Sequence, residues 1–179
     1  MKKTFRLLWL IGLLAVIGGV GTVVYFFGGM FNVAASEEDP GIVNWALEYV
    51  RTASIARHAT EKPPGSLNDQ KLVEAGAKSF SERGCWHCHG GPGVEWSKFS
   101  EGLNPGPPDL KDVVGDMLPQ ELFWVIKNGI KMTGMPSFAK IEVPDDEIWK
   151  IVAFLKKLPV VSEEDYKTWT AAAPAAAKP

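Results

Sequence analysis

The longest apolar stretch of the chain lies near its start. No charged residue occurs between Leu7 and Ser36, and residues 7–33 are apolar apart from glycines, Thr22 and Asn32. A helix needs about 20 apolar residues, at roughly 1.5 Å of rise each, to cross the hydrocarbon core of a bilayer. The pattern therefore predicts one N-terminal transmembrane helix.

Charge and length indicate how this segment is used. A signal-peptide core spans about 7 to 15 residues, so this longer run favours a retained anchor, although residues 33–35 also form a tolerable cleavage site. Three basic residues precede the run, and the next one along the chain is Arg51. Because basic residues favour the cytoplasmic side, we expect a single pass through the inner membrane with a cytoplasmic N-terminus and a periplasmic remainder.

Helical spacing of apolar residues recurs in the rest of the chain. We expect an amphipathic helix over about residues 40–60, with Asp39 as N-cap and Pro40 in the first turn, ended by residues 63–65, Pro-Pro-Gly. Its apolar face is expected to pack on the main domain or to rest at the membrane surface. If residues 63–65 act as a flexible linker, the following domain would move as a tethered shuttle.

Four helices are expected beyond this linker. They are a helix with Leu72, Val73, Gly76 and Phe80 on one face, a helix from Pro119 to near Gly129, a helix from an Asp145 N-cap to Leu158, and a short helix begun by the capping box of residues 162–165. No strand pattern competes, so the predicted fold class is all-α.

These patterns divide the chain into four segments. Residues 1–35 form the anchor, residues 36–66 the amphipathic helix and Pro-rich linker, residues 67–160 the main domain, and residues 161–179 a short helix and a disordered Ala/Pro tail. The 179 residues carry 19 Lys and Arg against 21 Asp and Glu. Without a basic face there is no reason to expect nucleic acid as a partner.

Residues 85–89 read Cys-Trp-His-Cys-His, which contains the C-x-x-C-H motif of covalent haem attachment. Two cysteines three positions apart on one helical turn can reach two vinyl groups along one edge of a porphyrin, and the next residue, His89, then lies beneath the iron. A disulfide between Cys85 and Cys88 would not require His89 to follow. A closed zinc site needs four ligands, and His87 is badly placed to complete a tetrahedron. We therefore expect one haem c, covalently bound, with His89 as a ligand of its iron.

The second axial ligand is expected from the turn-rich segment at residues 126–138. Met135 is the better candidate, since Gly134 permits tight backbone geometry and Pro136 fixes the chain just after it. Met132 lacks this flank and is expected to pack against the ring or the loop. Met117 is expected to be a core side chain.

The order of these features resembles bacterial class I cytochrome c over about residues 69–159. The resemblance is carried by Gly76 and Phe80, the motif at residues 85–90, residues 107–110 (Pro-Pro-Asp-Leu), residues 129–130, residues 135–138 (Met-Pro-Ser-Phe) and an aromatic C-terminal helix. It implies a small helical fold around one haem, in which Gly76 and Phe80 cross against Trp149 and Phe154. It also implies a haem pocket with Leu110 and a proline carbonyl, from Pro107 or Pro108, that receives the N–H of His89.

Iron held by both His89 and Met135 has no open site for a substrate, so the expected role is electron carrier rather than enzyme. The resemblance points to a membrane-anchored cytochrome that passes single electrons between a donor and an acceptor protein in a respiratory or photosynthetic chain. Three alternatives stay open at this point. They are a subunit of a larger dehydrogenase or oxidoreductase complex, a gas sensor or weak peroxidase if Met135 is displaceable, and a thiol oxidoreductase without haem.

Overall fold

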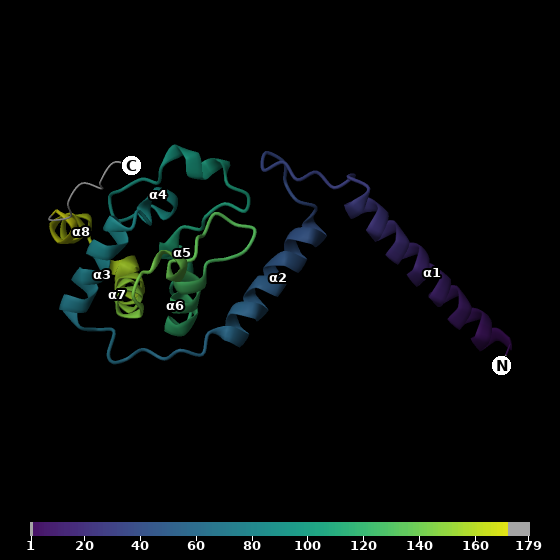
Figure 1. The fold of residues 1–179 in the computed structure, drawn as a ribbon, viewed down its shortest axis with the longest axis horizontal. Coiled ribbons are helices and arrows are strands. Elements are labelled where there is room, and N and C mark those ends of the chain that lie inside the picture. Colours follow the sequence, from purple (N-terminus) through teal and green to yellow (C-terminus); the bar gives the residue numbers. More distant parts are fainter. Residues whose placement is uncertain (1, 172–179) are drawn as a thin grey trace. The chain divides into compact units, whose positions relative to one another are not determined.

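The computed structural model describes residues 2–171, and the tail predicted at residues 172–179 lies outside them. The chain divides after Glu37 into two compact units (Figure 1).

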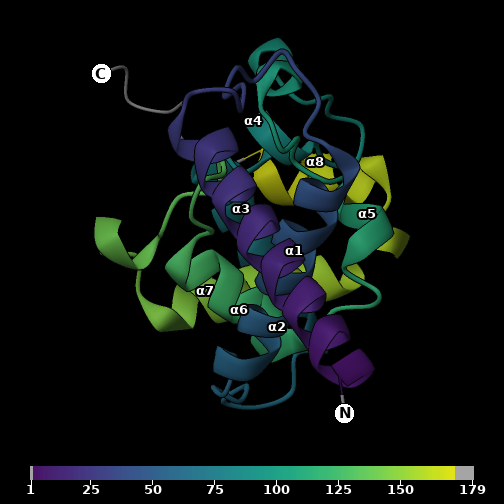
Figure 2. The same cartoon turned by 90° about the vertical axis from the view of Figure 1, so that its right-hand side faces the viewer.

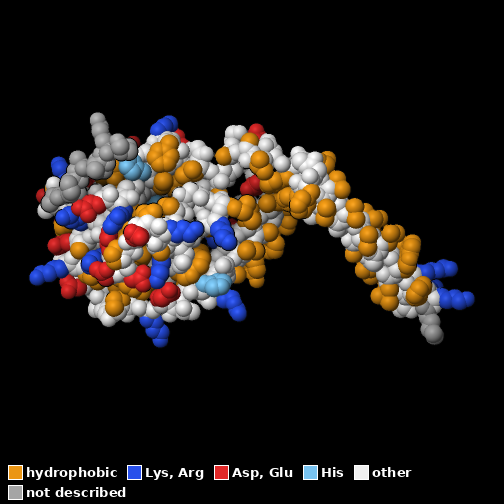
Figure 3. Space-filling model, in the orientation of Figure 1, with side chains coloured by type: hydrophobic (Ala, Val, Ile, Leu, Met, Phe, Trp, Pro, Cys, Tyr) orange, Lys and Arg blue, Asp and Glu red, His pale blue; other side chains and the backbone are white. Residues whose placement is uncertain are grey.

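The first unit is built on a single long helix, α1, which spans Lys2–Phe27. It is long and apolar enough to cross a membrane by length and composition, and none of its residues is buried within the protein. Hydrophobic side chains cover its length in the space-filling view (Figure 3). The helix includes the basic residues that precede the apolar run and ends at Phe27, before the run does, at a pair of glycines of which Gly29 has φ +74°.

The second unit consists of helices joined by loops. Its elements are α2 (Gly41–His58), α3 (Gln70–Glu82), α4 (Trp86–His89), the 3-10 turn η1 (Lys98–Gly102), α5 (Leu110–Val113), α6 (Pro119–Asn128), η2 (Ala139–Ile141), α7 (Asp145–Lys157), η3 (Leu158–Val160) and α8 (Glu163–Thr170). Between residues 2 and 171 there is no strand, only an isolated bridge between Gly91 and Val94. The predicted all-α class is confirmed.

The predicted helices are all present, but two of their N-caps were wrong. Pro40, not Asp39, occupies the N-cap of α2, and Pro144, not Asp145, occupies that of α7. Asp145 instead lies in the first turn of α7, where a carboxylate is stabilised by the positive end of the helix dipole. Ser162 does cap α8, because its hydroxyl accepts a hydrogen bond of 3.0 Å from the backbone N–H of Asp165.

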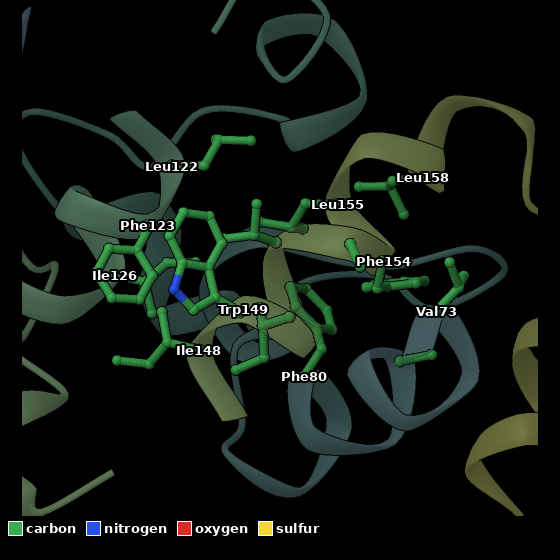
Figure 4. Packing of buried hydrophobic residues seen from close by; sticks show 14 of the residues in the cluster. Val73, Phe80, Leu122, Phe123, Ile126, Ile148, Trp149, Phe154, Leu155 and Leu158 are labelled. Carbon is green, nitrogen blue, oxygen red and sulfur yellow. The ribbon is translucent and has the colours of Figure 1, made fainter. Parts of the chain in front are cut away.

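The core forms where α3 crosses α7. Gly76 has no side chain at the crossing, and a Cβ there would overlap the carbonyl oxygen of Lys150. Phe80 and Phe154, whose ring centroids lie 5.3 Å apart, pack beside it as predicted (Figure 4). The partner that the structure shows for Trp149 is Phe123 of α6, on which its ring stacks at 4.2 Å. Helices α6 and α7 lie side by side in both ribbon views (Figures 1 and 2), so the tryptophan extends the core from the crossing to α6.

Helix α2 belongs to this same unit because its C-terminal end packs on α6. Ile55 and Ala59 are buried, and the ring of His58 lies 6.1 Å from that of Trp124 on α6. Residues 63–65 therefore connect two packed helices, and the tethered shuttle cannot pivot at that linker as expected from the sequence. The stretch without regular secondary structure between α1 and α2 is residues 28–40, which is where such movement must be sought.

The crossing of α3 and α7 gives a test of stability. Gly76→Ala should lower the free energy of unfolding by about 2 kcal/mol or more, because the new methyl group forces the two backbones apart. Gly65→Ala is the matched control, since nothing lies within 4 Å of an added Cβ there. Chemical unfolding followed by circular dichroism measures both, and equal stability of the two variants would contradict the tight crossing.

Candidate functional site

The cysteine motif follows directly on α3. Gly84, with φ +71°, turns the chain at the end of this helix, and the N–H of Cys85 donates to the carbonyl of Phe80 at 3.1 Å. Cys88 and His89 then donate their backbone N–H groups to the carbonyl of Cys85 at 3.2 and 3.1 Å. One turn of helix thus carries both thiols, with His89 immediately after them, as the motif predicts.

The two thiols are free, and Cys85 differs in its surroundings from reactive cysteines. Cys85 packs against the hydrophobic core, and this burial raises the pKa of its thiol to about 12. Since the thiolate is the nucleophile in disulfide exchange, a thiol this weakly acidic is unsuited to that chemistry. The geometry therefore disfavours a thiol oxidoreductase.

The ring of His89 is oriented by one backbone carbonyl. Its Nδ1 lies 2.9 Å from the carbonyl oxygen of Pro108, and a carbonyl only accepts, so Nδ1 carries the proton. Burial lowers the pKa of His89, against the opposing effects of the Pro108 hydrogen bond and the charge of Asp109. The imidazole is therefore neutral near pH 7 and keeps the lone pair of Nε2 free for a metal.

The sequence left two prolines open as the acceptor, and Pro108 makes the contact. The chain is fixed just beyond it, where the side chain of Asp109 accepts from the N–H of Lys111 at 2.9 Å and so caps α5. Leu110, the first residue of α5, packs against the core. Because these contacts hold the Pro108 carbonyl in place, they also hold the His89 ring.

The two methionines of the loop after α6 have different environments. Met135 is half-buried and packs against the core, whereas Met132 is 87% exposed. Met132 also has φ +60°, in the left-handed region. Its exposed side chain does not pack against the loop, whereas packing against the ring stays a prediction. Of the two methionines, Met135 is the one that packs against the core. Met117 packs against the core as predicted.

Ile130 and Thr133 hold Met135 in place, and of these the sequence had not singled out Thr133. The N–H of Met135 donates to the hydroxyl of Thr133 at 3.1 Å, and its carbonyl accepts from the N–H of Ile130 at 3.2 Å. Gly129, with φ +67°, makes this closure possible, because a Cβ there would lie 2.8 Å from the Met135 carbonyl oxygen. Gly134 lies in tight surroundings as predicted, because a Cβ there would lie 2.9 Å from Cδ1 of Leu103. The part given to Pro136 stays a prediction, and Thr133 and Gly129 add the contacts of Met135 itself. In the sequence, this hydrogen bond was indicated only by the threonine that stands two residues before the methionine.

Two further contacts brace the cysteine motif. Nδ1 of His87 lies 2.7 Å from the hydroxyl of Ser97, which ties the motif to the next loop. Tyr166 of α8 is buried, stacks on Phe154, and would contact a Cβ added at Gly91 just after the motif. The sequence predicted α8 but not its position, because the contact between Tyr166 and Gly91 joins residues some 75 positions apart in the chain.

A cavity of about 580 Å³ opens on one side of His89. Its walls include Gly90, Trp96, Lys98 and Asp109. Neither the cysteines nor Met135 line it. The cavity therefore flanks the histidine rather than joining the two proposed ligands.

The motif geometry agrees with a comparison of the chain with known families. A family model described as cytochrome C oxidase, cbb3-type, subunit III matches residues 71–155. These residues form a c-type cytochrome domain. No curated protein and no solved structure matches the chain. The cytochrome domain confirms the predicted resemblance, and its work is haem-based electron transfer.

The residues of the cytochrome domain fit a covalently bound haem c. Both thiols are free, they lie one turn apart, and the histidine after them is neutral and turned by a fixed carbonyl. A thioether bond at each cysteine and an Fe–N bond at His89 need these properties together. The identity of the individual ligand and pocket residues stays a prediction.

The contact of α8 gives a test in alkaline solution. Burial raises the pKa of Tyr166 to about 12, above its ordinary value of 10.0. Between these values the unfolded chain loses the phenol proton while the folded chain keeps it, so stability falls as the pH rises through the window. Tyr166→Phe should reduce this fall, because phenylalanine has no proton to lose.

Chemical unfolding across that pH window measures the effect. Tyr49→Phe, at an exposed ring of α2, is the matched control and should keep the pH dependence of the wild type. An unchanged fall in Tyr166→Phe would show that α8 does not shield the phenol.

Proposed function

We propose that the chain is a membrane-anchored, mono-haem electron carrier that passes single electrons between two redox proteins of a respiratory or photosynthetic chain. The observation that carries the proposal is the neutral His89, turned by Pro108, on the same helical turn as two free thiols. Once bound, a haem c supplies a one-electron Fe(III)/Fe(II) couple.

Each residue has a distinct part in this proposal. Cys85 and Cys88 would form the thioether bonds that keep the cofactor from dissociating. His89 Nε2 would ligate the iron, and the hydrogen bond from Nδ1 to Pro108 raises the basicity of this nitrogen. The Met135 sulfur would be the second ligand, since a thioether favours Fe(II) and raises the reduction potential relative to a second imidazole.

The assignment of Met135 as a ligand is supported by the hydrogen bonds that restrain its backbone. An unrestrained loop would bring its sulfur to the iron only at an entropic cost, whereas hydrogen bonds at 3.1 and 3.2 Å fix both backbone sides of this residue. If His89 and Met135 both held the iron, no position would remain for a substrate, and the carrier role is therefore favoured over a gas sensor or peroxidase.

The anchor sets where the carrier works. Helix α1 is the one candidate membrane span among residues 2–171. In this proposal it crosses the membrane with Lys2, Lys3 and Arg6 at the cytoplasmic end. The rest of the chain then lies on the periplasmic side of the inner membrane, where thioether attachment of haem c takes place in the bacterial proteins that it resembles. Donor and acceptor are reached at the membrane surface.

A second candidate function has an observation in its favour. The matching family is described as a subunit of a cbb3-type cytochrome c oxidase, which is a larger membrane complex. The chain would then be a fixed electron-transfer subunit, receiving electrons from a soluble donor and passing them within the complex. The two candidate functions share the same haem chemistry. They differ in whether the protein binds its redox partner transiently or stays bound to it in a stable complex.

The ligand assignment is tested by a pair of methionine variants. Met135→Ala should abolish the weak red absorption band that marks methionine-to-iron ligation in the oxidised protein, lower the reduction potential, and allow the reduced protein to bind carbon monoxide. Met132→Ala is the matched control and should change none of these, because its side chain is exposed. If the wild type itself binds carbon monoxide, or if Met132→Ala loses the band, the assignment is wrong.

Purification in mild detergent separates the two candidate functions. A free carrier should elute as one polypeptide with one covalent haem, measured by mass spectrometry of the intact protein. Constant stoichiometric recovery of oxidase or dehydrogenase subunits, through successive columns, would favour the fixed subunit instead.

A further inference from the structure

One face of α2 is apolar and has no partner among the described residues of the protein. Ile42, Trp45, Tyr49, Ala53 and Ala56 recur at positions i, i+3, i+7, i+11 and i+14, which places them along one side of the helix. We call these five residues the aromatic face. Ile42, Trp45 and Tyr49 are 70, 62 and 66% exposed, and the two aromatic rings stack at 6.1 Å. Three large apolar side chains exposed together on a surface are typical of a site that contacts a protein or a membrane.

Most polar residues of α2 lie away from this face, and Thr52 and Arg57 lie at its two edges. Asn44, Glu48 and Arg51 follow one another at helical spacing on the other side, and Arg51 pairs with Glu48 at 3.3 Å. The contact with α6 uses Ile55 and Ala59, which are not part of the aromatic face either. Figure 3 shows hydrophobic side chains gathered along the helix. The aromatic face is thus free of charge and free of the domain contact.

The position of α2 in the chain identifies the surface that covers the aromatic face. Only residues 28–40 separate it from the end of α1, and a segment of this length extends to at most about 45 Å. If α1 crosses a bilayer, α2 therefore starts close to the membrane surface. Tryptophan and tyrosine are the residues that prefer the headgroup region, since each has an apolar ring and a polar atom.

We propose that the aromatic face of α2 lies in the headgroup region of the bilayer that α1 crosses. This proposal rests on the proposed membrane anchoring, but not on the haem ligands. Because the other end of α2 is packed on α6, lipid contact would hold the cytochrome domain at the membrane surface, within reach of membrane-bound redox partners.

The attraction is hydrophobic rather than electrostatic. The residues that lead into α2 include three consecutive acids, Glu37, Glu38 and Asp39, and one of its arginines, Arg51, is paired with Glu48. A basic patch that would bind anionic lipids is therefore missing from this part of α2. Lipid contact should accordingly persist at high salt, unlike the binding of a polybasic segment.

Photocrosslinking of the full-length protein tests the proposal directly. The photoreactive amino acid benzoylphenylalanine replaces Tyr49 in one variant and Asn44 in a second, and each is reconstituted in nanodiscs of phosphatidylethanolamine and phosphatidylglycerol. Both positions are exposed, so the fold should be kept, and the haem absorption spectrum checks this. After irradiation, mass spectrometry detects the adducts.

Lipid adducts at position 49, at low and at high salt, with none above background at position 44, would support the proposal. Adducts at position 49 to a second copy of the chain, to another protein or to α1 would overturn it, as would the absence of any adduct. A carbonate wash of native membranes tests the anchor separately. Release of the protein by carbonate would overturn both the anchoring and this proposal, whereas retention without lipid adducts would overturn this proposal alone.

Discussion

The close crossing of α3 on α7 is the contact on which the rest of the cytochrome domain depends. Gly76 removes the side chain that would separate the two backbones, and Phe80 and Phe154 fill the space beside it. The end of α3 is thereby fixed in space, and the cysteine motif starts at the next turn. The site is thus positioned by a core contact that touches none of its functional atoms.

Two segments far apart in the chain contact this motif, and a third confines the proposed second ligand. The loop at Pro108 orients His89, and α8 packs Tyr166 against Phe154 and Gly91, just after the motif. The loop at residues 129–138 confines Met135. Each is held by backbone hydrogen bonds or caps of its own. Rigid supports of this kind suit an electron carrier, because little rearrangement then accompanies the change of charge.

The docking of α2 on α6 makes this helix a packed part of the second unit. With Ile55 and Ala59 buried, the stretch without regular secondary structure between α1 and α2 is residues 28–40. The aromatic face then lies on a packed helix and not on a loose linker. Helix α2 and the cysteine motif are consequently linked through the packed helices α6, α7 and α3.

The sequence by itself determined what depends on short spacing along the chain. The motif at residues 85–89, the apolar run of α1, the boundaries of α6 and the all-α class all follow from residues within a few turns of one another. Helix caps were less certain, because Pro40 and Pro144 competed with the neighbouring aspartates for the same position.

Only the tertiary structure decided the contacts between distant segments. It selected Pro108 over Pro107, turned Met132 outward, placed Trp149 on Phe123 and packed α2 on α6. Spacing along a chain specifies which face of a helix is apolar, but not which of several apolar surfaces will cover it. That choice depends on how all the helices pack at once around one core.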